Sequence, residues 1–215
     1  MPLPPDVKAV NIGCGTSIAA GWINIDNSPN ARLSKYPRLR WMLWKLRILS
    51  DQHYRINWSD SVLIHDVRKR LPFQDSSVDY VYTSHFLEHN SLSDARRIIA
   101  DVFRILKDGG IFRVVVPDLA IGARRYLDAL KETPPDQTAA SDFLEWMQLS
   151  RPGDRDPHLW MYDEPSLTAI LLELGFASVV VCRFKQGKVP DCDAIDNRPD
   201  DSLFVEAEKA NQILT

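Results

Sequence analysis

The hydrophobic pattern alternates between short apolar runs and longer amphipathic stretches. Five of the runs are five or six residues long and bounded by turn residues, so they predict buried strands. They are residues 7–11, 22–26, 61–65, 78–83 and 111–116. Residues 93–107 predict an amphipathic helix, because apolar residues recur at helical spacing along one face. The Gly109-Gly110 pair is expected to end it.

The second half of the chain predicts further helices and a closing pair of strands. Amphipathic or capped stretches predict helices at residues 119–131, 137–149 and 165–174, with residues 151–157 as a loop. The last two strands, residues 177–184 and 202–208, have no helix between them, so we expect a hairpin with an antiparallel final strand. The whole alternation predicts an α/β fold, a three-layer α/β/α sandwich around a mostly parallel sheet.

A glycine turn follows the first predicted strand, in the stretch from Val10 to Thr16. Gly13 and Gly15 lack side chains, so the backbone there can adopt unusual dihedral angles and lie against a ligand. Asp26 ends the second strand, where a carboxylate can accept hydrogen bonds from the hydroxyls of a ribose. The pattern indicates either a nucleoside site or an ordinary tight turn between two strands.

Two features disfavour a dinucleotide at this turn. Dinucleotide sites use a third glycine and an acid about 20 residues further on, but Ile18 occupies the third position and Asp26 comes much earlier. Residues 16–21 leave room for barely one helical turn, so no seat for a pyrophosphate at a helix N-terminus is evident. The turn therefore favours a nucleoside without phosphates.

Residues 31–58 differ from the rest of the chain in charge and aromatic content. They hold seven Lys and Arg against one acid, Asp51, so the segment carries +6 and the remainder −9. Pro37 can open a helix with two apolar rows, one of them carrying Trp41 and Trp44. We expect either an insertion that packs on the domain, or a face for an anionic substrate or anionic membrane. Nucleic acid is the weakest alternative, because the rest of the chain is acidic.

Bulk composition fits one globular domain spanning residues 1–215 with a sizeable core. A net charge of −3 gives no overall attraction to nucleic acid. No apolar run is long enough to span a bilayer, and the N-terminus lacks the pattern of a signal peptide. Three scattered cysteines fit no disulfide framework, so the cytoplasm is the expected compartment. The five histidines lack metal-ligand spacing, so no metal is expected.

Polar side chains cluster at residues 84–89, directly after the fourth predicted strand, where open parallel sheets place ligands. His85 can point into a cleft and act as a base, or be a hydrogen-bonded structural histidine. His89 is expected to cap or pin the next helix. Asp118, after the fifth strand, can face a substrate or be a turn residue. Cys14 is interpreted as a small buried residue and not as a nucleophile.

With these segments in this order, the chain resembles the class I S-adenosylmethionine-dependent methyltransferases, most of all the small bacterial proteins of that superfamily described as predicted methyltransferases. The resemblance implies a Rossmann-like methyltransferase fold, with a seven-stranded sheet in the order 3-2-1-4-5-7-6 and strand 7 antiparallel. Residues 31–58 lie outside the common pattern, and the short first crossover departs from it. The resembling segments are residues 10–15, 21–26, 71–82, 88–89, 104–116, 158–176 and 203–209.

The resemblance also implies where S-adenosylmethionine binds. Gly13 and Gly15 match the glycines beside its methionine moiety, and Asp26 matches the acid that takes the ribose hydroxyls. Asp66 matches the residue that accepts from the adenine amino group, with Val67 alongside the ring. The full implied set is Asn11, Gly13, Cys14, Gly15, Asp26, Asp66, Val67, Ser84 and His85.

The implied activity is in-line transfer of a methyl group to a small-molecule or saccharide-type acceptor, the saccharide resting on family analogy alone. Ser84 and His85 match positions at the methyl end of the cofactor. His158 lies in the region that roofs the acceptor site, so His85 and His158 are the candidate catalytic residues. The alternatives are a non-catalytic cofactor-binding module of the same fold and a nicotinamide oxidoreductase.

Overall fold

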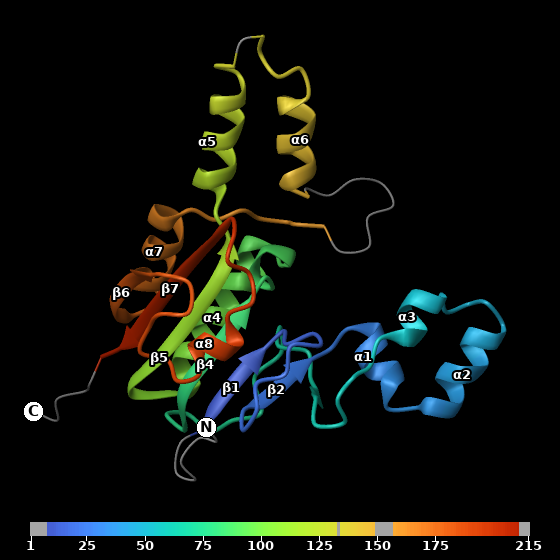
Figure 1. Ribbon diagram of the computed structural model, residues 1–215. Helices are drawn as coiled ribbons and strands as arrows, with labels where there is room; N and C mark the ends of the chain where they lie inside the picture. The colour runs from blue at the N-terminus through green and yellow to red at the C-terminus, as the bar shows by residue number, and fades with distance from the viewer. Residues whose placement is uncertain (1–7, 133, 149–156, 211–215) are drawn as a thin grey trace, which may run out of the picture.

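A seven-stranded sheet forms the centre of the computed structural model, which describes residues 8–132, 134–148 and 157–210 (Figure 1). The strand order is β3-β2-β1-β4-β5-β7-β6. β7 runs antiparallel to β5 and β6, and the remaining pairs are parallel. This confirms the predicted strand order and the antiparallel last strand, although Val7, Leu149 and most of the predicted 151–157 loop lie outside the described residues. The strands are β1 (Ala9–Ile12), β2 (Ile23–Asp26), β3 (Leu63–Ile64), β4 (Val78–Ser84), β5 (Leu106–Pro117), β6 (Phe176–Cys182) and β7 (Ser202–Lys209).

One face of the sheet carries the main hydrophobic core, under α4 (Leu92–Ile105) and α7 (Glu164–Glu173). Both helices follow the predicted apolar spacing, and each fully buried Leu or Ile side chain contributes roughly 1.5–3 kcal/mol. Ser91 caps α4 and Asp163 caps α7 by accepting from backbone N–H groups of the first turn. The apolar residues they bury are Ala95, Ile98, Ile99, Val102, Ile105, Leu167, Ile170 and Leu171.

The opposite face is covered mainly by connecting segments. Trp22, from the connection between β1 and β2, packs with Val189 and Ile195 against Tyr82 and Phe204 of the sheet. No helix forms between β1 and β2, as the short spacing predicts. The long connection from β6 to β7, where no helix was predicted, contains the short helix α8 (Cys192–Ile195).

A buried ion network fixes this long connection to the sheet. Arg113, on β5, has no exposed side-chain surface and donates to both oxygens of Asp196 and to Glu206 Oε1. It also donates to the carbonyl oxygens of Arg183 and Gln186, so all five guanidinium donors have acceptors. Burial opposes the charge of Arg113, but the two carboxylates outweigh burial and raise its pKa.

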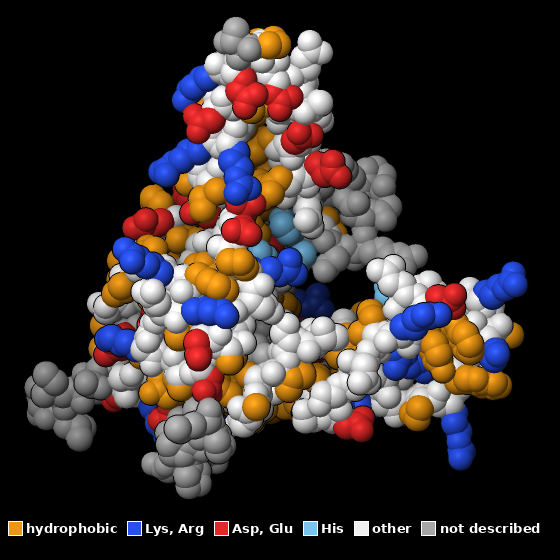
Figure 2. Space-filling view, viewed as in Figure 1, with side chains coloured by type: hydrophobic (Ala, Val, Ile, Leu, Met, Phe, Trp, Pro, Cys, Tyr) orange, Lys and Arg blue, Asp and Glu red, His pale blue; other side chains and the backbone are white. Residues whose placement is uncertain are grey.

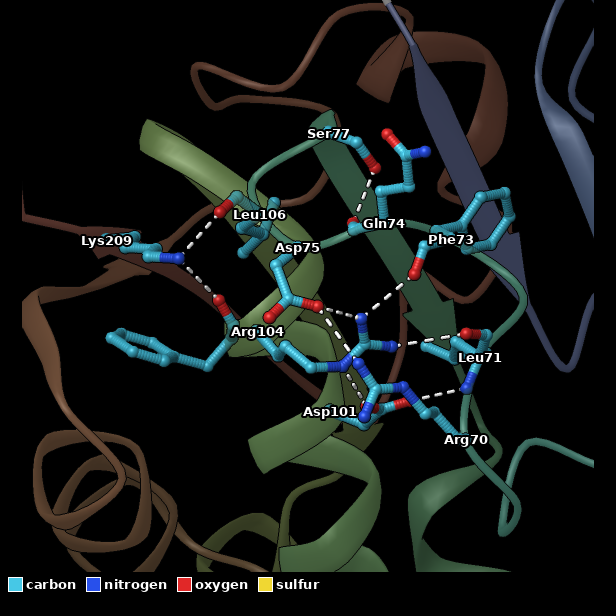
Figure 3. A network of polar contacts seen from close by, with 11 residues as sticks. Arg70, Leu71, Phe73, Gln74, Asp75, Ser77, Asp101, Arg104, Leu106 and Lys209 are labelled. Carbon is cyan, nitrogen blue, oxygen red and sulfur yellow. Dashed lines mark hydrogen bonds and ion pairs between the residues drawn. The ribbon is translucent and has the colours of Figure 1, made fainter.

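A second network fixes the connection between β3 and β4 to α4 (Figure 3). Arg104 Nε donates to Asp101 Oδ1 at 2.6 Å, and its Nη atoms donate to the carbonyl oxygens of Leu71 and Phe73. Asp101 Oδ2 in turn accepts from the backbone N–H of Leu71 at 2.5 Å. The segment that follows Asp66 is therefore held against a rigid helix.

α4 ends earlier than predicted, at Ile105, because β5 begins immediately with Leu106. Leu106 pairs with Val78 ahead of a register shift, so the Gly109-Gly110 pair lies inside the strand and does not end the helix. Gly109 has a φ of 73°, which only glycine adopts readily, and it lets the strand bend at this irregularity.

Two helical parts extend beyond the sheet (Figure 1). One is an upright pair, α5 (Leu119–Ala129) and α6 (Ala139–Trp146), which follows β5. The other, here called the arm, follows β2 and contains α1 (Pro29–Ser34), α2 (Pro37–Lys45) and α3 (Asp51–Arg55). α2 begins at Pro37 as predicted but ends at Lys45, so the predicted apolar rows continue beyond the helix. Among the described residues, no helix combines the length and hydrophobicity needed to cross a membrane.

Candidate functional site

The carboxyl ends of four parallel strands meet at one edge of the sheet, and each strand leads into a predicted site segment. Ile12 pairs with both Ile25 and Thr83, so the glycine turn lies between the ends of β2 and β4. Asp26 pairs with Ile64, which brings the end of β3 to the same edge. The fold therefore brings the predicted cofactor segments together.

Both glycines of the turn have left-handed backbone angles, with φ of 66° at Gly13 and 53° at Gly15. A Cβ at Gly13 would lie 2.4 Å from the ring of Phe86, so packing also requires a glycine there. A Cβ at Gly15 would meet no atom within 4 Å, which leaves open space above the turn. That open space is where a ligand can approach the backbone.

Asp26 joins the end of β2 to this turn. Its Oδ2 accepts from the backbone N–H of Gly15 at 3.0 Å, and its Oδ1 accepts from that of Ser28 at 2.7 Å. Each carboxylate oxygen has two acceptor positions, so capacity remains for hydroxyl donors. A partly exposed carboxylate beside an open glycine backbone fits the ribose of a nucleoside-containing cofactor.

Asn11 and Cys14 support the turn from below. Asn11 is buried, and its Nδ2 donates to Asn24 Oδ1 and to the carbonyl oxygen of Ser17, both at 3.0 Å. Asn24 in turn bonds to Ala19, so these amides hold the connection between β1 and β2 in place. Burial, with a smaller effect of the neighbouring Asp26 charge, raises the pKa of the Cys14 thiol to about 12. Cys14 is therefore a neutral thiol at physiological pH.

Asp66 and Val67 lie differently from the other cofactor candidates. Arg68 donates from Nε and Nη2 to the two oxygens of Asp66, each at 2.9 Å. This hydrogen bonding holds the pKa of Asp66 below its ordinary value. Val67 is buried and belongs to the main hydrophobic core. A ligand that binds Asp66 therefore meets a carboxylate that is already paired with Arg68, whereas the Val67 side chain packs into the core.

His85 follows β4 in a strained backbone conformation, with a φ of 49°. Its backbone N–H donates to the carbonyl oxygen of Val115 at 2.9 Å, which holds the turn after Ser84. The ring lies between two polar side chains, with Nε2 2.9 Å from Ser202 Oγ and Nδ1 3.4 Å from Glu88 Oε1. Strain of this kind persists where surrounding contacts fix it, and it is common at functional sites.

Glu88 is the site residue that the sequence did not single out. Its side chain has no exposed surface, yet neither carboxylate oxygen accepts a hydrogen bond from any described residue. His158 Nδ1 and Tyr162 Oη are likewise buried without a hydrogen-bond partner among the described residues. The segment carrying them is tied to Glu88, because Leu159 donates its backbone N–H to the Glu88 carbonyl oxygen at 2.7 Å. In the sequence, nothing about a glutamate between Leu87 and His89 indicates that its side chain is buried.

Two histidines complete this cluster, and Figure 2 shows histidine side chains at the base of the upright helical pair. The rings of His89 and His158 meet edge to face, with centroids 4.9 Å apart. Ligand atoms of Glu88, His89 and His158 lie within 4.8 Å of one another. Burial lowers the pKa of His158, against the opposing effect of the Glu88 charge.

The structure corrects one expectation and decides another. Of the two roles expected for His89, to cap or to pin the next helix, the first is wrong, because Ser91 Oγ accepts from the N–H of Asp94 and caps α4. Asp118 is the N-cap of α5, with Oδ1 accepting from the N–H of Ala120 at 2.9 Å. Asp118 is thus held as a helix-capping residue.

Residues 10–114 match the model of a family described as Methyltransferase domain. No curated protein matches the chain. Among solved structures, an S-adenosylmethionine-dependent methyltransferase from Methanosarcina mazei is 20% identical with a TM-score of 0.51, the match covering 98% of this chain and 95% of that one. One from Archaeoglobus fulgidus is 15% identical with a TM-score of 0.51, covering 95% and 87%.

A third similar structure is the complex between the Haloferax volcanii Trm112 methyltransferase activator and a methyltransferase. The match is 17% identical with a TM-score of 0.53, and it covers 98% of this chain and 86% of that one. At these identities the solved structures establish the fold. The fold is the one that the resemblance implies, and the family match over residues 10–114 supports a methyltransferase.

Proposed function

Taking the family match over residues 10–114 as the premise, we propose that this chain transfers a methyl group from S-adenosylmethionine to a small-molecule or saccharide-type acceptor. The observation that carries the proposal is the Asp26–Gly15 hydrogen bond beside open space at the strand edge. The bound cofactor supplies an electrophilic methyl group on a sulfonium. The saccharide class rests on analogy with related folds.

The chain's own residues bind and orient the reactants. Asp26 accepts from the ribose hydroxyls, and the open backbone at Gly15 lets the methionine end approach. Asp66, with Arg68 attached, takes the adenine amino group. Holding the methyl and the acceptor in line can supply roughly 7–11 kcal/mol of the barrier reduction.

His85 is the proposed base for a hydroxyl acceptor. Its Nε2 faces Ser202 Oγ and its Nδ1 faces the buried Glu88 carboxylate, so the ring orientation is fixed from both sides. A positioned base contributes about 10²-fold or more to such a step. His158, the second candidate catalytic residue, is buried in the same cluster.

Calorimetry with S-adenosylmethionine and with NAD tests the cofactor. We expect binding of the former, weakened by about 1–3 kcal/mol in Asp26→Ala through the lost hydrogen bonds. Asp60→Ala, at an exposed carboxylate, is the matched control and should bind as the unmodified chain does. Tight binding of NAD alone, or full affinity in Asp26→Ala, would contradict the assignment.

Formation of S-adenosylhomocysteine over a panel of hydroxyl and amine acceptors tests the reaction. Turnover that falls much more than cofactor affinity in His85→Asn supports the assigned base. Binding without turnover on any acceptor supports the alternative, a cofactor-binding module without activity.

The free cysteines fit the cytoplasm as the proposed compartment.

We also propose that the arm contacts an anionic membrane surface or anionic substrate. α2 has no buried residue, and Leu39, Trp41 and Met42 are each more than two-fifths exposed. Lys45 Nζ lies 4.6 Å from the ring centroid of Trp44, so cations and indoles share one face. Basic residues beside tryptophan suit a membrane interface.

The arm's charges differ in their roles. Arg40 is half-buried and donates to the carbonyl oxygens of Tyr54 and Ile56, so it joins α2 to α3. The test variant should therefore spare it and replace Arg38, Lys45 and Arg47 with Gln. We expect reduced sedimentation with phosphatidylserine vesicles and unchanged cofactor binding. The control replaces Lys69, Arg70 and Lys131, which are exposed on the body. Equal sedimentation of both variants would contradict the proposal.

A further inference from the structure

The cluster beside His85 has a composition that methyl transfer does not require. It combines one carboxylate and two imidazoles from segments 69 residues apart in the sequence, Glu88-His89 and His158. We propose that Glu88, His89 and His158 form a binding site for a divalent transition-metal ion, with Zn²⁺ as the representative. Binding of the ion does not depend on the proposed methyl transfer, although Glu88 also contacts His85.

The first support is the state of Glu88. Its side chain is completely buried, and both oxygens lack a hydrogen-bond donor among the described residues. A buried carboxylate without partners is costly, so native proteins pair such charges or use them as metal ligands. His85 Nδ1, which can carry a positive charge, lies 3.4 Å from Glu88 Oε1. The other carboxylate oxygen, Oε2, is not paired with this ring.

The second support is the orientation of the two imidazoles. His89 Nδ1 lies 3.2 Å from the carbonyl oxygen of Pro157. Metal-bound histidines commonly donate their other ring N–H to such a carbonyl. His158 Nδ1 is buried and has no partner among the described residues. Both rings thus lie beside the Glu88 carboxylate, within reach of one ion.

The third support is the mutual distance of the ligand atoms. One atom from each of the three side chains lies within 4.8 Å of the others, close enough for one ion with small side-chain rotations. Two imidazole nitrogens and one carboxylate oxygen select Zn²⁺ and similar ions over Mg²⁺ or Ca²⁺, which prefer all-oxygen sites. Three protein ligands also leave a coordination position for water or another small ligand.

Metal binding is tested directly with ZnCl₂ on full-length protein first treated with a chelator. We expect one Zn²⁺ per chain after desalting, measured by elemental mass spectrometry, and a melting temperature that rises with ZnCl₂ concentration. Glu88→Gln and His158→Asn should each weaken the Zn²⁺ affinity at least about tenfold. Melting curves without metal establish that each variant is folded.

Two control variants separate this site from other binding. His65→Asn removes a histidine on the β3 side, and the triple variant Cys14→Ser, Cys182→Ser and Cys192→Ser removes every thiol. Both should bind one Zn²⁺ with unchanged affinity. Absence of bound Zn²⁺ in the unmodified chain would overturn the proposal. Retained affinity in folded Glu88→Gln, or loss in the cysteine variant alone, would overturn it as well.

Discussion

Two buried charged clusters lie on the same sheet and differ in one respect. Around Arg113, every guanidinium donor has an acceptor, and Asp196 and Glu206 balance the charge. Around Glu88, a carboxylate of equal burial has no hydrogen bond among the described residues. A buried polar group without a hydrogen bond destabilises the folded state. Such a group is therefore unexpected in a cluster whose only role is to stabilise the fold.

The two clusters also lie in different parts of the fold. The Arg113 cluster lies under the connection from β6 to β7 and fixes it to the sheet, away from the strand ends. The Glu88 cluster lies at the carboxyl end of β4, next to His85 and the proposed cofactor edge. We infer that the first contributes to stability and that the second is preorganised to bind.

The largest effect on stability is expected from a substitution in the Arg113 cluster, where every guanidinium donor has an acceptor. Arg113→Ala leaves two buried carboxylates without their cation, so the free energy of unfolding should fall by about 3–5 kcal/mol. Urea denaturation measures it. Lys131→Ala, which removes an exposed ion pair with Asp128, is the control and should change stability by less than about 0.5 kcal/mol. A loss below about 1 kcal/mol in Arg113→Ala would show that the network is not structural.

A smaller loss is expected from crowding the same network. A Cβ at Gly187 would lie 2.1 Å from Glu206 Oε1 and 2.6 Å from Arg113 Nη1. Gly187→Ala should therefore lower the free energy of unfolding by about 1–3 kcal/mol, as overpacking does. The measurement is again urea denaturation. Unchanged stability would mean that the network shifts freely and is less rigid than its hydrogen bonds indicate.

The unsatisfied cluster should respond in the opposite direction. Without metal, Glu88→Gln removes an unpaired buried charge, so the free energy of unfolding should stay level or rise by about 1 kcal/mol. With Zn²⁺ present, the unmodified chain should become the more stable of the two. Thermal melts with and without ZnCl₂ measure the crossover. A marked loss of stability in metal-free Glu88→Gln would contradict this expectation and would show that Glu88 stabilises the fold, as the Arg113 cluster does.

The smallest effect concerns Asp66, whose carboxylate is partnered but near the surface. Its pKa is lowered in the folded state by Arg68, so the contribution to stability is present above the ordinary pKa and is lost as pH falls through the folded value. Asp66→Asn should therefore lower stability by less than about 1 kcal/mol at pH 6, and the difference should be smaller at pH 3. Thermal melts at the two pH values check this. A difference that grows toward acid would contradict it.

The sequence predicted the strands and most helices because their apolar spacing is regular, and the family resemblance supplied the strand order. It placed the end of α4 too late, because a glycine pair looks like a helix stop whereas pairing of Leu106 with Val78 decides the boundary. The apolar rows predicted for the helix of the arm continue past Lys45, but α2 ends at that residue.

The candidate site was predictable in part. Asp26 and the glycine turn follow from the strand–turn–strand pattern, and they lie together as expected. Glu88 could not be found in this way, because its burial depends on residues 158–162 crossing the end of β4. Arg113 carried a signal, a lone charge within an apolar strand, whereas its partners Asp196 and Glu206 are set by tertiary structure.

The most direct test of the central claim is a crystal structure with S-adenosylhomocysteine. We predict that the ribose hydroxyls bond to the Asp26 carboxylate, that the amino-acid end of the ligand lies over Gly15, and that the sulfur is directed toward Ser84 and His85. A ligand bound elsewhere, or one that leaves Asp26 bonded only to Gly15 and Ser28, would contradict it.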